Sequence, residues 1–534
     1  MLCSRRATPS IASCRRLHRK IYSPFIPTVP FPDPQVKPRE QFAVSNPANG
    51  EQLCVVEIAS ESDVKQTVAG AQSIFQAGTW SRAPAIERSK TLTRLARALE
   101  ERIPELAEIE TLQTGRSIRE MRAQLTRLPE WIEYYAALLR TSQAFVAPTQ
   151  GKLLNYVQRV PLGVVAQITP FNHPLLIAVK KIAPALAAGN SVIVKPSELA
   201  PISVLEFARM AEAAGVPSGV LSVLPGFGAT AQLLAQNPLV RKVDVTAGTQ
   251  TGRLLGSTVG HNLAAFTAEL GGKAPVIVFD DADIASAVNG AAFAAFVASG
   301  QTCVSGTRLI IHESIWDEFM PLFVEKANSI RRRMGNPSNH KSTMGTVISE
   351  RHLRRIQSML DESLNSGKGE VLTGGERLSG KSELDGFDFD GGSFFGPTVI
   401  ANIETSSDLW QEEIFGPVVV AKRFSTEEEA VTLANDSKYG LGAGIWTQNL
   451  SRAHRIAAEI EAGICWVNTA HRNDPSSPWG GMKESGIGRE NGIEAFESCK
   501  YSQSKSIIVN IAPTSESRIT DDWFAEDAEG RRYG

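Results

Sequence analysis

Two short segments, residues 269–275 and residues 296–303, contain residue types that could work together in one active site. The first reads Glu-Leu-Gly-Gly-Lys-Ala-Pro, and the second reads Phe-Val-Ala-Ser-Gly-Gln-Thr-Cys and ends in Cys303. A cysteine nucleophile needs a positioned base, and Glu269 is a candidate for that base. The glycines in both segments allow backbone N–H groups to come close to a reacting oxygen. The pair predicts covalent catalysis by a thiol together with a carboxylate.

A third candidate, Asn172, lies in residues 169–174, which read Thr-Pro-Phe-Asn-His-Pro. The two prolines restrict the backbone on either side of the amide side chain. We interpret Asn172 as a rigid hydrogen-bond donor, for example to an oxyanion, although the same pattern also suits a plain turn. His173 has no partner evident in the sequence, so we expect it to line a pocket or make a polar contact, without a catalytic role.

Composition and charge exclude several classes of protein. A chain of 534 residues exceeds one hydrophobic core, so two or three domains are expected. The net charge of −2 gives no electrostatic reason to expect nucleic acid binding. The six cysteines show neither a C-x-x-C pair nor metal-ligand spacing, which favours free thiols in a reducing compartment and no metal site. The uncharged run 284–307 contains polar breaks, so we expect a buried helix and a loop there, and no membrane span.

The N-terminal residues 1–32 contain six basic residues and no acidic residue. An Arg-rich, Ser-containing, acid-free segment is typical of a mitochondrial transit peptide, and we expect mitochondrial targeting from it. The alternative is a disordered basic tail on a cytoplasmic protein. The segment has no apolar core of the kind that directs secretion.

The pattern between residues 60 and 140 is helical, and we assign packing and no chemistry to it. From residue 151, strand-like runs alternate with helical segments, which favours a parallel sheet covered by helices. Ligands of such sheets bind beyond the carboxyl ends of the strands. The strands are expected at 164–168, 191–194, 220–224, 242–246 and 275–279, and the helices at 175–188, 202–214, 229–236 and 249–260.

Three glycine-containing or charged turns compete for a nucleotide cofactor. Residues 226–231 match G-x-G-x-x-A, with Asp244 eighteen positions after Gly226, as in a dinucleotide fingerprint. Lys195 and Glu198 follow a strand and could reach ribose hydroxyls, although they also suit a solvated turn. Residues 246–252 form a turn that opens a helix, and a helix N-terminus can hold phosphate.

A second alternating region runs from residue 308 to about 480, with helices expected at 314–332 and 349–366 and strands near 417–421 and 464–468. Residues 412–417 read Glu-Glu-Ile-Phe-Gly-Pro, and residues 478–490 contain glycines, Trp479 and several charges. Residues 501–509 form a polar, strand-like run, which we interpret as an edge strand free to pair with another subunit. Residues 511–534 are expected to be a charged tail.

These motifs, in this order, resemble the NAD(P)-dependent aldehyde dehydrogenase superfamily over roughly residues 40 to 510. The resemblance implies an α/β fold with a Rossmann-like parallel-sheet cofactor domain, a second α/β catalytic domain and a small β flap for oligomerisation, in a homodimer or homotetramer. The N-terminal extension is expected at 1–32 and the charged tail at 511–534. The NAD-binding domain is expected to comprise 33–140, 161–270 and the return segment 482–498, and the catalytic domain 271–481. The oligomerisation strands are expected at 141–160 and 499–510.

By position, the resemblance implies that Cys303 is the nucleophile, that Glu269 activates water, and that Asn172 holds the oxyanion with the Cys303 backbone N–H. It implies indirect or proton-relay roles for Lys483 and Glu490. The implied reaction is oxidation of an aldehyde to the carboxylic acid through a thioester. A CoA-acylating enzyme, or a catalytically silent binding protein of this fold, are the alternatives.

The resemblance also implies a cofactor site and places the pyrophosphate near residues 246–252 instead of at G-x-G-x-x-A. This chain has Val-Thr-Ala-Gly at 245–248, where the family usually has Phe-Thr-Gly-Ser, so Gly248 offers only backbone contacts. A carboxylate on the adenosine ribose repels a 2′-phosphate, so Glu198 favours NAD over NADP. The residues expected to contact the cofactor are Lys195, Glu198, Gly248, Thr249, Gly252, Glu413 and Phe415.

Phe171, His173, Trp479 and the 471–478 loop are expected to line the substrate entrance. Their aromatic character suits a bulky aldehyde that is aromatic or a semialdehyde. Trp479 lies in a motif that is also similar to that of betaine aldehyde dehydrogenases, where aromatic rings meet a quaternary ammonium, so a cationic substrate stays an open alternative.

Overall fold

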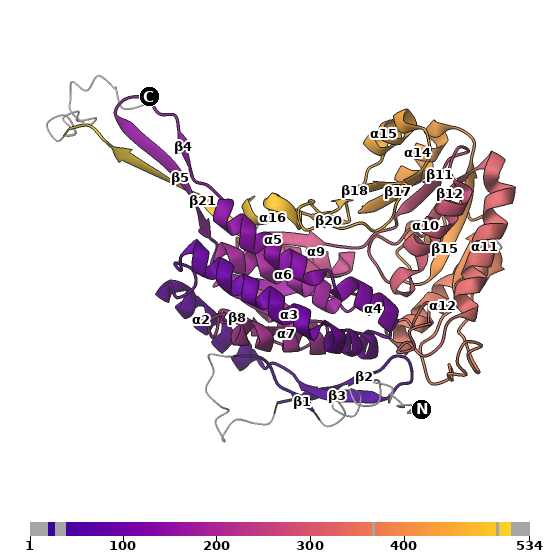
Figure 1. Ribbon diagram of the computed structural model, residues 1–534, viewed down its shortest axis with the longest axis horizontal. Coiled ribbons are helices and arrows are strands. Elements are labelled where there is room, and N and C mark those ends of the chain that lie inside the picture. Colours follow the sequence, from indigo (N-terminus) through magenta and orange to yellow (C-terminus); the bar gives the residue numbers. More distant parts are fainter. Residues whose placement is uncertain (1–19, 27–38, 366–368, 498–500, 514–534) are drawn as a thin grey trace, which may run out of the picture.

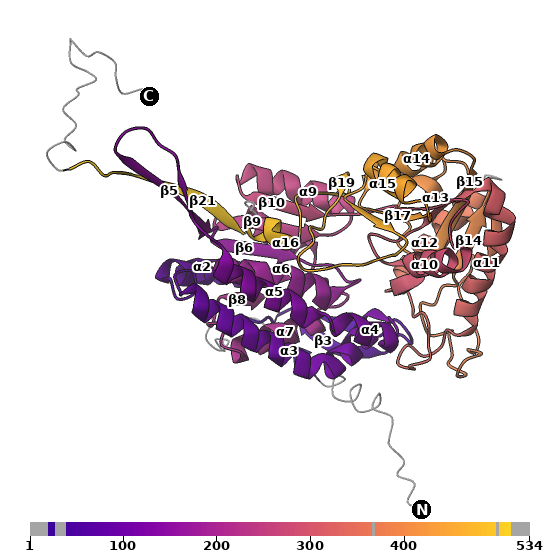
Figure 2. The ribbon, with the colours of Figure 1, turned by 45° about the horizontal axis from the view of Figure 1, so that its top comes forward.

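The computed structural model describes residues 20–26, 39–365, 369–497 and 501–513. Two large sheets, each covered by helices, make up the two halves of the body, and a narrow three-stranded sheet projects away from it (Figure 1). The turned view in Figure 2 shows the same projecting arm. This architecture confirms the predicted α/β class with two sheet-containing parts and a small β flap.

The first large sheet has six strands in the order β20-β10-β9-β6-β7-β8, of which all but β20 run parallel. The central strand β6 (Val164–Ile168) and its neighbour β7 (Ser191–Lys195) are buried at every residue, as a strand covered by helices on both faces must be. The remaining strands are β8 (Leu221–Val223), β9 (Val240–Thr246), β10 (Ala265–Glu269) and β20 (Gly486–Ile487).

Helices pack against this sheet and against one another. In α3 (Ala85–Thr114), Leu92, Leu95 and Leu99 recur at helical spacing and are almost fully buried, so the predicted helical face is the packing face. The other helices of this half are α2 (Glu61–Ala77), α4 (Ile118–Leu125), α5 (Leu128–Thr141), α6 (Pro174–Ala188), α7 (Ile202–Ala213), α8 (Gly228–Gln236), α9 (Thr249–His261) and α16 (Gly492–Glu497).

The second large sheet has seven strands in the order β13-β14-β15-β12-β11-β17-β18, with only β13 antiparallel. Its strands are β11 (Pro275–Val278), β12 (Arg308–His312), β13 (Glu370–Thr373), β14 (Thr398–Ala401), β15 (Val418–Phe424), β17 (Gly442–Trp446) and β18 (Ile464–Val467). Its helices are α10 (Ile284–Phe296), α11 (Trp316–Arg332), α12 (Glu350–Asn365), α13 (Asp408–Gln411), α14 (Glu427–Asn435) and α15 (Leu450–Glu459).

The strand pattern alone grouped the run at 275–279 with the strands of the first sheet, whereas the resemblance placed residues 271–481 in the catalytic domain. β11 pairs with β12 and β17 in the second sheet. The first sheet is completed by β10, which we did not predict because its residues, Ala-Phe-Thr-Ala-Glu, form a short run without a strong apolar pattern. Residues 270–274 therefore join the two sheets. The uncharged run at 284–307 forms α10 and a loop, as expected.

Three smaller sheets complete the described part of the chain, and the shortest of them pairs β16 (Tyr439–Gly440) with β19 (Met482–Lys483). In the arm, β21 (Ser502–Asn510) pairs along its whole length with β5 (Leu153–Pro161), which also pairs with β4 (Phe145–Ala147), so β21 is an edge strand as expected. Near the N-terminus, β1 (Ile21–Tyr22) pairs with β3 (Gln52–Glu57), which also pairs with β2 (Gln41–Ser45). Tyr22 is buried, so residues 20–26 of the expected extension belong to the folded body.

No helix in the described ranges combines the length and the apolarity needed to cross a bilayer.

A buried ion cluster connects the arm to the first sheet. Lys181 of α6 contacts Asp244 of β9 at 2.5 Å and also pairs with Glu490. The Tyr501 hydroxyl, next to β21, donates to Asp244 and accepts from Gln167 Nε2 at 3.1 Å. Lys181 and Asp244 are fully buried. Burial opposes the charge on Lys181, but the two carboxylates raise its pKa above the usual range.

Replacing Lys181 by Met should lower the free energy of unfolding by about 3–5 kcal/mol, because it leaves two buried carboxylates without their shared cation. The control is Lys65→Met, which removes an exposed ion pair with Glu61 and should change stability by no more than about 1 kcal/mol. Urea denaturation followed by tryptophan fluorescence measures both. Equal shifts for the two variants would contradict the assignment of Lys181 as the centre of the cluster.

Candidate active site

The nucleophile candidate lies in a tight turn after α10. Ala298 and Ser299 both have φ of 55°, and Gly300 has φ of 70°. A Cβ on Gly300 would lie 2.1 Å from the carbonyl oxygen of Gly416, so the close approach of the two backbones requires glycine here. Three successive residues in the left-handed region reverse the chain and leave Cys303 at the start of the next loop.

Asn172 lies at the same turn, although it is 131 positions away in the chain. Its Nδ2 donates to the carbonyl oxygen of Gln301 at 2.9 Å, and the side chain is buried. The Asn172 carbonyl oxygen accepts from Arg116 Nη1 at 3.1 Å. The amide is therefore held two residues from Cys303, as its proposed role as an oxyanion donor requires.

Glu269 is the last residue of β10, and its backbone is fixed on both sides. It pairs with Thr246 in β9 and with Gly486 in β20. Its side chain is buried, and a Cβ on Gly480 would lie 2.9 Å from Glu269 Oε1. The carboxylate therefore lies against the 479–490 loop.

The segment after Glu269 packs directly on the Cys303 turn. A Cβ on Gly272 would lie 2.1 Å from the carbonyl oxygen of Cys303, and one on Gly271 would lie 2.6 Å from Glu413 Oε2. Gly272 N donates to Glu413 Oε1 at 2.9 Å. The two adjacent glycines bring Cys303 and Glu413 to the end of β10.

The electrostatic surroundings keep the Cys303 thiol protonated. Burial raises the pKa of Cys303 to about 12, and the negative charges of Glu269, Glu413 and Glu490 act in the same direction. Lys180 lowers it. At neutral pH the thiol therefore needs a proton acceptor, or a change in its surroundings, before it can act as a thiolate.

Lys195 and Glu198 lie at the carboxyl end of β7. Lys195 Nζ donates to Glu198 Oε2 at 3.3 Å, and the lysine is buried while the Glu198 side chain is partly exposed. Burial lowers the pKa of Lys195, and Glu198 opposes the shift. Hydroxyl groups of a sugar could accept a hydrogen bond from Lys195 and donate one to Glu198.

The N-terminus of α9 faces open space. A Cβ on Gly248, which precedes the helix, would meet no atom within 4 Å, whereas one on Gly252 would overlap the Leu270 side chain. The Thr246 hydroxyl is buried and has no hydrogen-bond partner in the described part of the chain. Backbone N–H groups at such a helix end suit an anionic group such as phosphate.

Glu413 and Phe415 lie in a turn held by α12. Arg355 donates to the carbonyl oxygens of residues 413 and 414, and His352 contacts that of Phe415 at 2.6 Å. Burial raises the pKa of Glu413 to about 7. The Phe415 ring meets Phe171 edge-on, with centroids 5.8 Å apart. Phe171 therefore lies beside a residue expected to contact the cofactor.

Arg116 and Gln124 hold the His173 ring, and Trp479 packs beside Trp466. His173 Nδ1 accepts from Arg116 Nη1 at 2.6 Å and from Gln124 Nε2 at 2.9 Å. Burial, with a contribution from Arg116, lowers the pKa of His173 well below its usual value, so the imidazole is neutral. The Trp479 ring lies 6.0 Å from that of Trp466.

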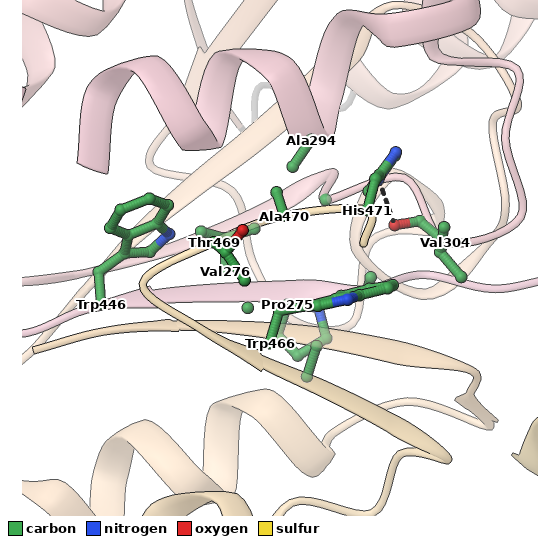
Figure 3. Close-up of a pocket in the computed structure, with 13 residues that line it drawn as sticks. Pro275, Val276, Ala294, Val304, Trp446, Trp466, Thr469, Ala470 and His471 are labelled. Carbon is green, nitrogen blue, oxygen red and sulfur yellow. Dashed lines mark hydrogen bonds between the residues drawn. The ribbon is translucent and has the colours of Figure 1, made fainter. Parts of the chain in front are cut away.

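A small pocket lies beside the Cys303 turn, between α10, β11 and the segment after β18 (Figure 3). His471 Nε2 and the carbonyl oxygen of Val304 are 3.3 Å apart across it. Burial lowers the pKa of His471 to about 4. The lining is otherwise mostly apolar and consists of Ala274, Pro275, Val276, Ala294, Val304, Gly306, Ala443, Gly444, Trp446, Trp466, Thr469, Ala470 and His471.

Two residues that the motifs connected with function, Asp244 and Lys483, contact other parts of the chain. Asp244, the acidic partner of G-x-G-x-x-A, is fully buried and contacts Lys181 and Tyr501, so it cannot bind a ribose. Lys483 Nζ donates to the carbonyl oxygens of Asn435 and Ser437. The spacing of the motifs could not predict the contacts of Asp244 or of Lys483, because their partners come from distant parts of the chain.

Sequence reasoning missed Arg116, Glu120 and Lys180 as neighbours of the site, whereas His471 begins the 471–478 loop that was expected to line the substrate entrance. Arg116 lies between α3 and α4, a region to which we assigned only packing. Nothing local distinguishes it from a surface arginine. Lys180 carried a usable signal, because Lys180 and Lys181 are the only charged residues in the otherwise apolar helix 174–188.

Comparison with known proteins identifies the family. The model of the aldehyde dehydrogenase family matches residues 35–507. This chain belongs to the aldehyde dehydrogenase family. It is similar to the solved structures of PnpE from Pseudomonas sp. WBC-3 (40% identity, 93% of this chain and 99% of that chain, TM-score 0.86). It is also similar to betaine aldehyde dehydrogenase from Staphylococcus aureus in complex with NAD+ (33% identity, 97% of this chain and 99% of that chain, TM-score 0.90). A third similar structure is the NAD+ complex of an aldehyde dehydrogenase from Bacillus cereus (32% identity, 95% of this chain and 99% of that chain, TM-score 0.88).

The expectation of mitochondrial targeting is contradicted by these comparisons. The similar aldehyde dehydrogenases come from bacteria, which have no mitochondria, and the alternative of a cytoplasmic protein fits them. An acid-free basic composition is shared by transit peptides and by other basic tails, so composition could not separate the two. Residues 1–19 lie outside the described part of the chain.

Glu269→Gln should lower the pKa of Cys303, because it removes one of the negative charges that raise it. The rate of iodoacetamide alkylation depends on the thiolate, so its pH profile should move to lower pH in the variant. Cys303→Ser, alone and combined with Glu269→Gln, supplies the background from the other thiols. An unchanged profile would show that the Glu269 charge does not act on Cys303.

Proposed function

We propose that this chain oxidises an aldehyde to the carboxylic acid through a covalent intermediate on Cys303, with NAD as the hydride acceptor. Its family supports aldehyde oxidation in general. The observation that carries the mechanism is the convergence on one turn of three distant segments: Cys303, the Asn172 amide bonded to Gln301, and the glycines that follow Glu269.

The residues of this chain fit a nicotinamide dinucleotide. The open N-terminus of α9 suits the pyrophosphate, as does the Thr246 hydroxyl, which has no hydrogen-bond partner among the described residues. The Lys195–Glu198 pair suits the adenosine ribose. Glu413 would hold the nicotinamide ribose, with Phe415 beside the ring. Gly248, Thr249 and Gly252 complete the helix end. When bound, the oxidised nicotinamide accepts a hydride. Similar structures that contain NAD support this assignment.

In the first half of the reaction, Cys303 Sγ bonds to the aldehyde carbon, and the thiol proton passes to the Glu269 carboxylate, which releases it to solvent before the second half. The Asn172 amide has two N–H groups, and the bond to Gln301 uses one of them. The second N–H, with the Cys303 backbone N–H, would stabilise the oxyanion that forms. Loss of hydride from this carbon leaves a thioester on Cys303.

In the second half, Glu269 removes a proton from water, which attacks the thioester carbon. The carboxylic acid then leaves, and Cys303 regains a proton. The position of Glu269 at the end of β10, beside the glycines that contact Cys303, supports this role. A CoA-acylating enzyme would not need this water-activating carboxylate, and a silent binding protein would not need the three groups together.

We assign Phe171, His173 and Trp479 to the substrate entrance, which suits a bulky aldehyde that is aromatic or a semialdehyde. We also propose assembly into a homodimer or homotetramer through the arm. β4 and β21 are its free edges, and Phe145, Val146 and Ile508 on them are exposed apolar residues. The proposed division into a cofactor domain, a catalytic domain and oligomerisation strands follows the two sheets and the arm.

Asn172→Ala should lower kcat by roughly 100- to 1000-fold, because one oxyanion donor is lost. Cys303→Ala should abolish turnover. NADH absorbance measured with a panel of aliphatic, aromatic and charged aldehydes tests both variants against the unaltered enzyme. Near-normal turnover of Asn172→Ala would remove it from the oxyanion site, and turnover of Cys303→Ala would end the covalent mechanism.

Cofactor choice should depend on Glu198. The unaltered enzyme should prefer NAD, because the carboxylate repels a 2′-phosphate. Glu198→Gln should raise the ratio of kcat/KM for NADP to that for NAD by about 10-fold, equivalent to about 1.4 kcal/mol. A preference of the unaltered enzyme for NADP would overturn the assignment of Glu198.

A further inference from the structure

Lys180 is a buried cation that the proposed mechanism does not use. It lies in α6 beside Lys181, and both side chains are at most 5% exposed. Lys181 is bonded to Asp244 and Glu490. Lys180 Nζ lies 3.4 Å from Glu490 Oε2, which is long for a hydrogen bond, and 4.7 Å from the centroid of the Trp479 ring. An ammonium group has three donors, so Lys180 retains capacity for another acceptor.

The surroundings of Lys180 lead to the nucleophile. Trp479 and Cys303 both pack against the apolar cluster of Val304, Leu441 and Trp466. Lys180 therefore covers one face of the indole whose cluster also contacts Cys303. The charge of Lys180 acts on the Cys303 thiol, which agrees with this placement.

The helix face that carries Lys180 also borders the expected substrate entrance. His173 is the N-cap residue of α6, and Lys180 lies seven positions later in the helix. Seven residues make about two helical turns, so the two residues lie on the same face. The two histidines near this face, His173 and His471, have lowered pKa values and are neutral. Arg116, a buried cation that contacts His173, is paired with Glu120 at 3.0 Å.

We infer that Lys180 determines the substrate class: its ammonium binds a carboxylate at the far end of the aldehyde, so the enzyme takes semialdehydes and disfavours cationic aldehydes. A carboxylate would form a charge-assisted hydrogen bond in a site that is shielded from water. A quaternary ammonium would find the Trp479 face already occupied by a like charge. The inference rests on the proposed function and chooses between the substrates that it left open.

The test uses three series of linear aldehydes of four to eight carbons that end in a carboxylate, a methyl or a trimethylammonium group. At the best chain length, the enzyme should prefer the carboxylate to the methyl group, and the ammonium series should be poorest. Lys180→Met should lower the carboxylate-to-methyl ratio of kcat/KM by roughly 10- to 100-fold, mainly through KM, and raise the ammonium-to-methyl ratio.

Two further variants separate this role from a structural one. Lys180→Arg keeps the charge and should retain most of the carboxylate preference. Lys90→Met, which removes an exposed lysine of α3, should leave the ratios unchanged. As a readout without turnover, the matching dicarboxylate product should raise the Tm of the unaltered enzyme more than that of Lys180→Met.

The inference is overturned if the unaltered enzyme shows no preference for the carboxylate series, if it prefers the ammonium series, or if Lys180→Met keeps the original ratios. A loss of stabilisation by the dicarboxylate in Lys180→Met, measured by Tm, supports it even if that variant has too little activity for kinetics. If the unaltered enzyme oxidises the methyl series but not the carboxylate series, only the inference fails. If it oxidises no aldehyde, the proposed function fails as well.

Discussion

The site depends on the close approach of backbone at Gly271 and Gly272 to the Cys303 turn. A Cβ at either position would overlap the Cys303 carbonyl or the Glu413 carboxylate. This contact joins the end of the first sheet to the loop that follows α10 of the second half. Because Glu269 lies two residues before Gly271, the same contact holds the proposed base close to the turn that carries the proposed nucleophile.

Burial at this junction has an electrostatic consequence. Three carboxylates near Cys303 add to the effect of burial and hold the thiol in its protonated form, while Lys180 is a cation that acts against them. Burial also raises the pKa of Glu413 into the neutral range. Small changes in charge near the turn can therefore change the fraction of thiolate, because the groups interact through a poorly solvated interior.

The buried cluster around Lys181 connects this chemistry to the arm. Glu490 pairs with Lys181 and faces Lys180, while Tyr501 contacts Asp244 at the base of β21. The 479–490 loop and the arm thus share one set of hydrogen-bonded charges. Any assembly through the arm would rest on the same network that positions the 479–490 loop.

The sequence by itself determined the alternation of strands and helices, the edge strand at 501–509, and the grouping of Cys303, Glu269 and Asn172 in family motifs. These are local patterns, and residue type and spacing are sufficient to predict them. Only the tertiary structure decided that β10 belongs to the first sheet, that Asp244 is an internal ion-pair partner, and that Arg116 and Lys180 border the site. Such assignments depend on contacts between residues far apart in the chain, and a buried lysine or arginine has no local pattern that distinguishes it from an exposed one.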